Sequence, residues 1–302
     1  MKVIFMGTPV YAQKILEELI RAKDMEVAAV YTQPDKPVGR KKVMTAPPVK
    51  ITAERAGIKT YQPEKLKDKE VIDELLKIEC DFIVVAAYGQ ILPPKILNHA
   101  PCINLHASIL PKYRGASPIQ EAILNGDTHT GVTAMKMDEG LDTGDIIKIS
   151  KTAIDDDEMV STLFEKLTHI AADLTLDVLR NYESYKQEKQ VNKEATNCSK
   201  ITKADGEIEF EDAVILYNKY RAFTPWPGIY LKSGLKLKEI MLRSACRAYD
   251  AGKILEINDD HIVVGCTLGA IKIYRVQPAS KKEMDILSYI NGKHLKVEDY
   301  LS

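Results

Sequence analysis

The sequence has few cysteines, almost no net charge and no long apolar run. Its 5 cysteines are an odd number without a C-x-x-C pair, which argues against a disulfide framework and against a zinc site. The formal net charge of −1 means that any contact with nucleic acid must come from a local basic cluster. No apolar stretch reaches the roughly 20 residues that span a bilayer, and residues 1–7 are too short for a signal-peptide core. We therefore expect a soluble, cytoplasmic protein with no membrane partner.

The glycine fingerprint of dinucleotide-binding folds is also missing. Gly7-Thr8-Pro9 stands at the end of the first predicted strand, where those folds carry G-x-G-x-x-G. Strand-like and helix-like segments nevertheless alternate through the first part of the chain, which is typical of a parallel α/β sheet. We predict an α/β fold with a Rossmann-like, mostly parallel sheet, and the missing fingerprint disfavours a nicotinamide-dependent dehydrogenase.

The length of 302 residues allows two domains, and the sequence pattern changes near residue 190. Before that point we expect strands at 3–6, 27–31, 82–87 and 102–105, helices at about 9–22, 68–80, 119–124 and 158–180, and a strand pair at 132–137 and 146–152. Residues 190–205 are polar and basic and indicate a linker. After it we expect a helix at about 212–223 and strands at 228–231, 235–242, 252–257, 261–266 and 270–276. Short strands at this spacing predict a small β-barrel.

Three polar residues have the chemistry that acyl transfer to an amine requires. Asn104 and His106 lie two apart near the end of a buried strand, so their side chains share one face. Asp142 stands in a glycine-rich turn at 140–145. An amide can donate to a developing oxyanion, an imidazole can carry a proton, and a carboxylate can orient the imidazole. Taken singly, each of the three is more often a structural residue, whereas the three together favour catalysis, and the pattern alone leaves this open.

The segment 34–50 is rich in proline and in cations. It follows the second strand, so in a parallel sheet we expect it at the same carboxyl edge as Asn104, His106 and Asp142, where ligands bind. A basic loop is often only solvated surface, but beside a reaction centre it suits a polyanionic substrate. Its cations are Lys36, Arg40, Lys41, Lys42 and Lys50, against the single acid Asp35.

These motifs resemble those of a known family. Asn104-x-His106, the following segment 108–111 and Asp142 resemble the catalytic signature of the folate-dependent formyltransferases. Three further segments resemble the branch of that family that acts on methionyl-tRNA, and the resemblance covers nearly the full length. They are Ile4-Phe5-Met6-Gly7-Thr8-Pro9, Thr32-Gln33-Pro34-Asp35-Lys36-Pro37-Val38-Gly39-Arg40 and Phe223-Thr224-Pro225-Trp226-Pro227-Gly228.

The resemblance implies a reaction and a domain organisation. A formyl group would pass from 10-formyltetrahydrofolate, as co-substrate, to the free α-amino group of methionine on initiator tRNA, for translation initiation. Residues 1–189 would form the catalytic, folate-binding formyltransferase domain, and 190–205 the basic linker. Residues 206–302 would form an OB-like domain that contacts the tRNA. No metal is implied.

The resemblance also implies roles for the candidate catalytic residues. Asn104 would donate its side-chain N–H to the oxyanion, and His106 would supply a second donor or carry the proton. Asp142 would pair with His106 and help to take the proton from the amine. Which of His106 and Asp142 takes it first is not determined by the sequence, nor is the oligomeric state, for which we expect a monomer.

Two further groups of residues would contact the substrates. In the resembled family the segment after the catalytic strand contacts the folate, which here assigns Ser108, Ile109, Leu110 and Pro111. The loop after the second strand grips the acceptor arm of the tRNA, which here assigns Arg40, Lys41 and Lys42.

Two alternative functions stay open at this point. A folate-dependent formyltransferase for a small amine, such as glycinamide ribonucleotide or an amino sugar nucleotide, would have the same three catalytic residues. The loop at 33–50 and the additional C-terminal domain favour the tRNA substrate, because a small amine needs neither. A catalytically silent RNA-binding module would suit the basic loop, but the intact set of Asn104, His106 and Asp142 counts against it.

Two expectations concern the C-terminal domain. Trp226, the only tryptophan, lies between two prolines and is expected to anchor the core at the entry to the domain. Basic residues in the first half of the domain could form one basic face for RNA, although ordinary surface cations are an equally good interpretation. They are Lys219, Arg221, Lys232, Lys236, Lys238, Arg243 and Arg247.

Overall fold

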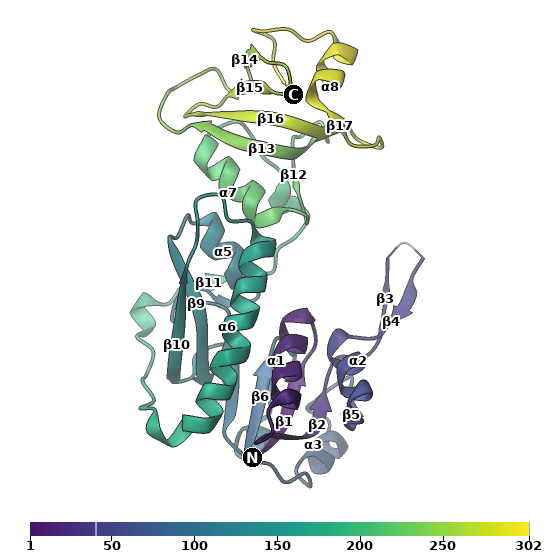
Figure 1. The fold of residues 1–302 in the computed structure, drawn as a ribbon, viewed down its shortest axis with the longest axis vertical. Coiled ribbons are helices and arrows are strands. Elements are labelled where there is room, and N and C mark those ends of the chain that lie inside the picture. The colour runs from purple at the N-terminus through teal and green to yellow at the C-terminus, as the bar shows by residue number, and fades with distance from the viewer. Residues whose placement is uncertain (40, 302) are drawn as a thin grey trace. The chain divides into compact units, whose positions relative to one another are not determined.

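The computed structural model describes residues 1–39 and 41–301, and the chain divides into two compact units (Figure 1). The first unit comprises Met1–Pro118, His129–Ala153 and Thr162–Cys198. The second comprises Ile119–Thr128, Ile154–Ser161 and Ser199–Ser302. The last change of unit along the chain therefore falls inside the segment 190–205 that the sequence predicts as a linker.

A seven-stranded sheet organises the first unit. Up to residue 181 the chain forms β1 (Lys2–Gly7), α1 (Val10–Arg21), β2 (Glu26–Tyr31), β3 (Lys36–Val38), β4 (Val43–Thr45), α2 (Pro48–Arg55), β5 (Thr60–Tyr61), α3 (Lys69–Leu75), β6 (Phe82–Ala86), α4 (Pro94–Leu97), β7 (Cys102–His106), β8 (Arg114–Gly115), α5 (Pro118–Leu124), β9 (His129–Lys136), β10 (Ile146–Ala153) and α6 (Val160–Asn181). The strand order is β10-β9-β7-β6-β1-β2-β5. Strands β7, β6, β1, β2 and β5 are mutually parallel, and β9 and β10 are antiparallel additions. The predicted Rossmann-like, mostly parallel sheet is confirmed.

The central strands are apolar along their whole length because both of their faces are covered. Every residue of β6 and β7 is buried, and in β1 only Lys2 is exposed. Such continuous apolar runs are typical of parallel strands with helices on both sides. Helix α1 shows the complementary pattern, since its buried side chains recur at helical spacing. They are Tyr11, Ala12, Ile15, Leu16 and Leu19.

The segment 34–50 has more regular structure than its proline content predicts. Strands β3 and β4 pair antiparallel, with Lys36 opposite Thr45 and Val38 opposite Val43, and α2 begins at Pro48. Pro37 lies within β3, an arrangement that an isolated two-stranded ribbon tolerates because each strand has a free edge.

Helix α3 is shorter than the helix predicted at 68–80, because it ends at Leu75. The turn after it is closed by a hydrogen bond from the Ile78 N–H to the Leu75 carbonyl.

The C-terminal part is dominated by one antiparallel sheet. After α6 the chain forms η1 (Tyr182–Ser184), η2 (Asn192–Glu194), β11 (Asn197–Cys198), η3 (Ala204–Gly206), α7 (Ala213–Phe223), β12 (Ile229–Tyr230), β13 (Lys236–Ser244), β14 (Ile254–Ile257), β15 (Ile262–Gly265), β16 (Ala270–Gln277), β17 (Met284–Asp285) and α8 (Ile286–Lys293). The sheet order is β12-β13-β16-β15-β14, and β17 also pairs with β16. This confirms the predicted C-terminal β domain, whose sheet is antiparallel, whereas closure into an OB-like barrel stays a prediction. Within the described residues no helix is long and apolar enough to cross a membrane.

Two expectations for the C-terminal part are wrong. Trp226 is 58% exposed, because Phe223 and Ile229, which are 2% and 1% exposed, already fill the core on either side of the turn. Arg221 is 5% exposed and does not contribute to a basic face. Its guanidinium donates to the carbonyl oxygens of Asp155 and Glu158 at 3.3 and 3.2 Å.

Candidate active site

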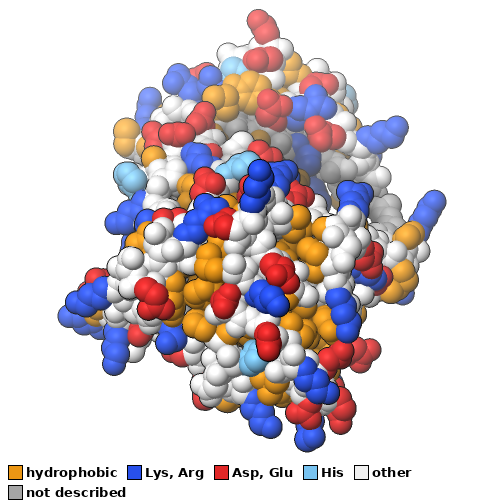
Figure 2. Space-filling view, turned by 60° about the horizontal axis from the view of Figure 1, so that its bottom comes forward, with side chains coloured by type: hydrophobic (Ala, Val, Ile, Leu, Met, Phe, Trp, Pro, Cys, Tyr) orange, Lys and Arg blue, Asp and Glu red, His pale blue; other side chains and the backbone are white. Residues whose placement is uncertain are grey.

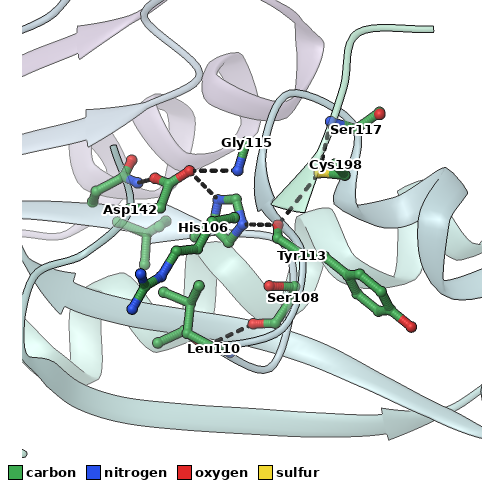
Figure 3. Close-up of polar contacts among 12 residues, drawn as sticks. His106, Ser108, Leu110, Tyr113, Gly115, Ser117, Asp142 and Cys198 are labelled. Carbon is green, nitrogen blue, oxygen red and sulfur yellow. Dashed lines mark hydrogen bonds and ion pairs between the residues drawn. The ribbon is translucent and has the colours of Figure 1, made fainter. Parts of the chain in front are cut away.

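The side chains of Asn104 and His106, from one face of β7, approach the same carboxylate, that of Asp142. Figure 3 shows the His106 ring turned towards Asp142. Asn104 Nδ2 donates to Asp142 Oδ1 at 3.3 Å, and His106 Nδ1 lies 3.6 Å from Asp142 Oδ2. The three residues are 9%, 6% and 8% exposed, respectively. The structure thus brings together the three catalytic candidates, although Asn104 and Asp142 are 38 positions apart in the sequence.

Asp142 does not come from a loop that follows a parallel strand at the carboxyl edge of the sheet, as we expect from the sequence. Strand β9 runs antiparallel to β7 and pairs its last residue, Lys136, with Ile103. The segment 137–145 therefore starts beside the beginning of β7, not at the carboxyl edge, and turns back towards His106. The backbone of Asp142 is left-handed, with φ of 53°. Gly144 permits the tight return, because a Cβ at that position would lie 1.8 Å from the Lys136 carbonyl oxygen.

The Asp142 carboxylate is bound by donors on both oxygens. Oδ2 accepts a hydrogen bond from the Gly115 N–H at 2.9 Å, and Oδ1 accepts from Asn104. Each oxygen of the carboxylate is thus held by a separate donor. The carboxylate therefore has a fixed orientation, with Oδ2 directed to the imidazole.

The orientation of the His106 ring is set by a backbone carbonyl. Nε2 lies 2.8 Å from the Tyr113 oxygen, and a carbonyl oxygen only accepts, so Nε2 carries a hydrogen in this arrangement. The nitrogen that faces Asp142 is therefore Nδ1. The Tyr113 oxygen also accepts from Cys198 Sγ at 3.4 Å, so it is held from a second side.

The four residues assigned to the folate divide into two pairs. The Ser108 hydroxyl donates to the Lys112 carbonyl at 2.6 Å, and the Leu110 N–H donates to Thr133 Oγ1 at 3.1 Å. Ser108 and Leu110 are 0% and 2% exposed, so both residues are part of the internal structure of the loop. Ile109 and Pro111 are partly exposed and have surface available for a ligand.

Two of the three residues assigned to the tRNA, Lys41 and Lys42, lie in the turn between β3 and β4. Lys41 and Lys42 are exposed, and Arg40 lies outside the described residues. The hairpin extends from the carboxyl end of β2, away from the sheet of its unit (Figure 1). Elsewhere, basic and acidic side chains are interspersed over the face seen in Figure 2, in accordance with the net charge of −1. The hairpin is thus a local basic projection rather than part of a general positive field.

One lysine of the hairpin region is neutralised within the protein. Lys50 Nζ binds both oxygens of Asp35, at 3.0 and 2.9 Å. Gln62 Nε2 donates to Asp35 Oδ1 at 2.7 Å and to the Gln33 carbonyl at 2.9 Å. The hydrogen bonds from Gln62 and then from Lys50 hold the pKa of Asp35 below its ordinary value. Lys50 therefore anchors the base of the hairpin.

Sequence reasoning missed the polar residues that surround Asp142 from the other side. Arg114 is 8% exposed, and its Nε and Nη2 donate to Gln190 Oε1 at 3.0 and 2.7 Å. Gln190 belongs to the predicted linker, whose polar composition gives no sign of contact with the site. The two-residue strand β11, which pairs with β8, is also too short to leave a periodic signal in the sequence.

Two family descriptions match the chain. The family described as Formyl transferase matches residues 1–179, and the one described as Formyl transferase, C-terminal domain, matches residues 200–294.

Curated relatives are similar over the whole chain. The methionyl-tRNA formyltransferase of Sulfurimonas denitrificans is 60% identical over 302 residues, which are 100% of each protein. That of a Nitratiruptor species is 56% identical over 301 residues, 99% of each. Among solved structures, the sugar 3N-formyl transferase WlaRD, crystallised with dTDP and 5-N-formyl-THF, is similar with a TM-score of 0.68 at 20% identity. That match covers 93% of this chain and 99% of WlaRD and concerns the fold alone.

The ion pair between Lys50 and Asp35 at the base of the hairpin should make the stability of the hairpin depend on pH in the acid range. A carboxyl group whose pKa is lowered on folding stabilises the folded form above its unfolded pKa of about 4 and stops doing so as the pH falls through the folded value. Amide hydrogen exchange over residues 36–50, corrected for the intrinsic exchange rate, should therefore show weaker protection at about pH 3 than at neutral pH.

Asp35→Asn should lower the protection at neutral pH and remove this acid dependence. The exposed Asp173 of α6 provides a matched control, since Asp173→Asn should leave the exchange of the hairpin unchanged. Equal protection in the parent and in Asp35→Asn at both pH values would contradict the anchoring role.

Proposed function

The chain belongs to the methionyl-tRNA formyltransferase family, and we propose that it transfers the formyl group of 10-formyltetrahydrofolate to the α-amino group of methionine on initiator tRNA. The whole-length similarity to methionyl-tRNA formyltransferases carries the assignment of the reaction. The buried group of Asn104, His106 and Asp142 supports the assignment of the catalytic residues.

Asn104 is suited to stabilise negative charge on the formyl oxygen. Its Nδ2 carries two hydrogens, and the hydrogen bond to Asp142 uses one of them. The other is available to an oxygen that becomes negative as the amine attacks the formyl carbon. A preoriented donor in a site screened from water stabilises such charge without having to reorganise.

His106 and Asp142 are suited to move the proton that the reaction displaces. The attacking amine must lose a proton, and the nitrogen that leaves the formyl carbon must gain one. Because Nε2 of His106 donates to Tyr113, Nδ1 is the ring nitrogen that would accept the proton of the attacking amine and give it to the leaving nitrogen. Asp142 Oδ2, 3.6 Å from Nδ1, would pair with the imidazolium between these two transfers. The pair thus receives one proton and returns one in each turnover.

The substrates would be held by two surfaces of the first unit. Ile109 and Pro111 are the partly exposed apolar residues next to the catalytic strand, and they fit contact with the flat ring system of a folate. Arg40, Lys41 and Lys42 would bind phosphates of the tRNA acceptor arm, whereas Lys50 is engaged by Asp35. Exposed apolar residues in the same hairpin, Val38, Val43 and Met44, add surface against which nucleotides can pack.

A direct assay tests the substrate assignment. The protein is mixed with 10-formyltetrahydrofolate and with either charged initiator methionyl-tRNA or an amino sugar nucleotide, and formyl transfer is followed. We expect transfer to the charged tRNA and none to the small amine. Transfer to the amino sugar nucleotide alone would overturn the proposal.

Removal of the oxyanion donor should abolish most of the activity. We expect Asn104→Ala to lower kcat by about two orders of magnitude or more, since this is the usual cost of losing one such donor. Folate affinity and the circular dichroism spectrum should stay close to those of the parent. Asn258→Ala, at an exposed turn of the C-terminal sheet, serves as the control. Near-normal turnover of Asn104→Ala would exclude this role.

The basic hairpin tip should control the salt dependence of tRNA binding. Each phosphate contact that is lost reduces the log–log slope of affinity against salt by roughly 0.7–0.9. Replacement of Arg40, Lys41 and Lys42 by Gln should therefore raise KM for the charged tRNA and flatten its salt dependence, while folate binding is retained. Arg40 alone should cost more than either lysine, because a guanidinium can bind a phosphate through two hydrogen bonds.

A matched triple variant tests whether position matters in addition to charge. Lys65, Lys67 and Lys77 are exposed lysines elsewhere in the first unit, and their replacement by Gln removes the same number of charges. If both triple variants change KM and the salt slope equally, the hairpin tip is ordinary solvated surface.

A further inference from the structure

Residues 190–198, which we call the strap, run alongside residues 113–115. The segment 113–115 contacts the catalytic pair, by which we mean His106 and Asp142. The strap pairs β11 with β8, with Asn197 opposite Arg114 and Cys198 opposite Gly115. Its closeness explains why residue 115 is glycine, because a Cβ there would lie 2.3 Å from the Cys198 carbonyl oxygen.

The strap also fixes the backbone of the orienting segment 113–115. The Thr196 carbonyl accepts from the Arg114 N–H at 2.9 Å, and the Thr196 hydroxyl accepts from the Tyr113 N–H at 2.9 Å. The same segment provides the Tyr113 carbonyl for His106 and the Gly115 N–H for Asp142. The strap therefore holds the backbone segment that itself binds both His106 and Asp142.

Gln190, the first residue of the strap, closes the turn that carries Asp142. Its Nε2 donates to the carbonyl oxygen of Asp142 at 2.9 Å and to that of Gly144 at 2.8 Å. Both amide hydrogens are used, and they join the two ends of a three-residue turn. The turn includes the left-handed backbone at Asp142, a conformation that is uncommon for non-glycine residues.

The buried guanidinium of Arg114 determines which way the Gln190 amide faces. A guanidinium only donates, and its Nε and Nη2 both lie within hydrogen-bond distance of Gln190 Oε1. The amide oxygen is thus held at Arg114, and the amide nitrogen must face the two carbonyl oxygens of the turn. Nη2 of Arg114 also donates to Asn192 Oδ1 at 3.0 Å, so a second residue of the strap holds the guanidinium in place.

We propose that Gln190 is a positioning residue for formyl transfer, which holds the 142–144 turn so that the Asp142 carboxylate faces Asn104 and His106. This inference rests on the proposed function, and it assigns Gln190 to the reaction through Asp142 rather than through contact with a substrate. Arg114 acts one step further away by fixing the direction of the Gln190 amide.

Gln190→Glu separates the donor role from mere side-chain packing. Glutamate keeps the length of the side chain and the acceptor for Arg114, but it cannot donate to the carbonyl oxygens of Asp142 and Gly144. We expect kcat to fall about ten- to a hundredfold, the scale at which small displacements of catalytic groups act. KM for the charged tRNA and for the folate should change little, and the acid limb of the pH–rate profile should shift.

Two comparisons make the test specific. Gln187 lies three positions earlier and donates to the Tyr182 hydroxyl at 3.0 Å, so Gln187→Glu removes a comparable bond away from the turn and should leave kcat and the pH profile unchanged. In a double-mutant cycle with Asp142→Asn, Gln190→Glu should have little further effect on kcat, because residues that act through one another are not additive.

A readout without substrate distinguishes failure of this inference from failure of the proposed function. Displacement of Asp142 should change the nitrogen chemical shifts of the His106 ring in Gln190→Glu and in Gln190→Ala, and leave them unchanged in Gln187→Glu. Unchanged His106 shifts, or an equal loss of kcat in the parent and Asp142→Asn backgrounds, would overturn the positioning role. If the parent does not formylate methionyl-tRNA, the proposed function fails while the shift experiment still tests Gln190.

Discussion

The Asp142 carboxylate connects three separate parts of the chain, and the geometry of the site depends on those connections. Asn104 from β7, the Gly115 N–H beside the strap and the His106 ring all meet its two oxygens. A carboxylate that is 8% exposed is costly to bury unless such donors surround it. The donors that the buried carboxylate requires are therefore also the groups that fix Asn104 and His106 beside each other.

Local periodicity in the sequence predicts one half of this site and not the other. The two-residue spacing of Asn104 and His106 on an apolar strand determines that they share a face, and β7 bears this out. The position of Asp142 depends on β9 running antiparallel to β7 and on the return of the chain at Gly144. The direction of β9 and the return at Gly144 depend on the strand order of the whole sheet. The residues of the turn alone do not predict that order.

The hairpin and the C-terminal entry show why composition alone misleads. Proline and lysine in the segment 34–50 predict a loop, yet an isolated ribbon with two free edges accommodates Pro37 in a strand. Trp226 predicts a core anchor by its size, but the neighbouring Phe223 and Ile229 occupy that core. Arg221 predicts a surface charge, but carbonyl groups at Asp155 and Glu158 receive its buried guanidinium. In each case packing against distant residues overrides the local preference.

The end of the first compact unit is likewise set by contacts between distant residues. A division at residue 189 follows from composition, since polar and basic residues begin there. The first compact unit nevertheless continues to Cys198, because β11 pairs with β8 and Thr196 holds the backbone of Tyr113 and Arg114. Without residues 190–198 the buried Arg114 guanidinium would lose the acceptors of Gln190 and Asn192, and an unpaired buried charge is strongly destabilising. The strap therefore belongs physically to the first compact unit, and the connection to the C-terminal part begins only after it.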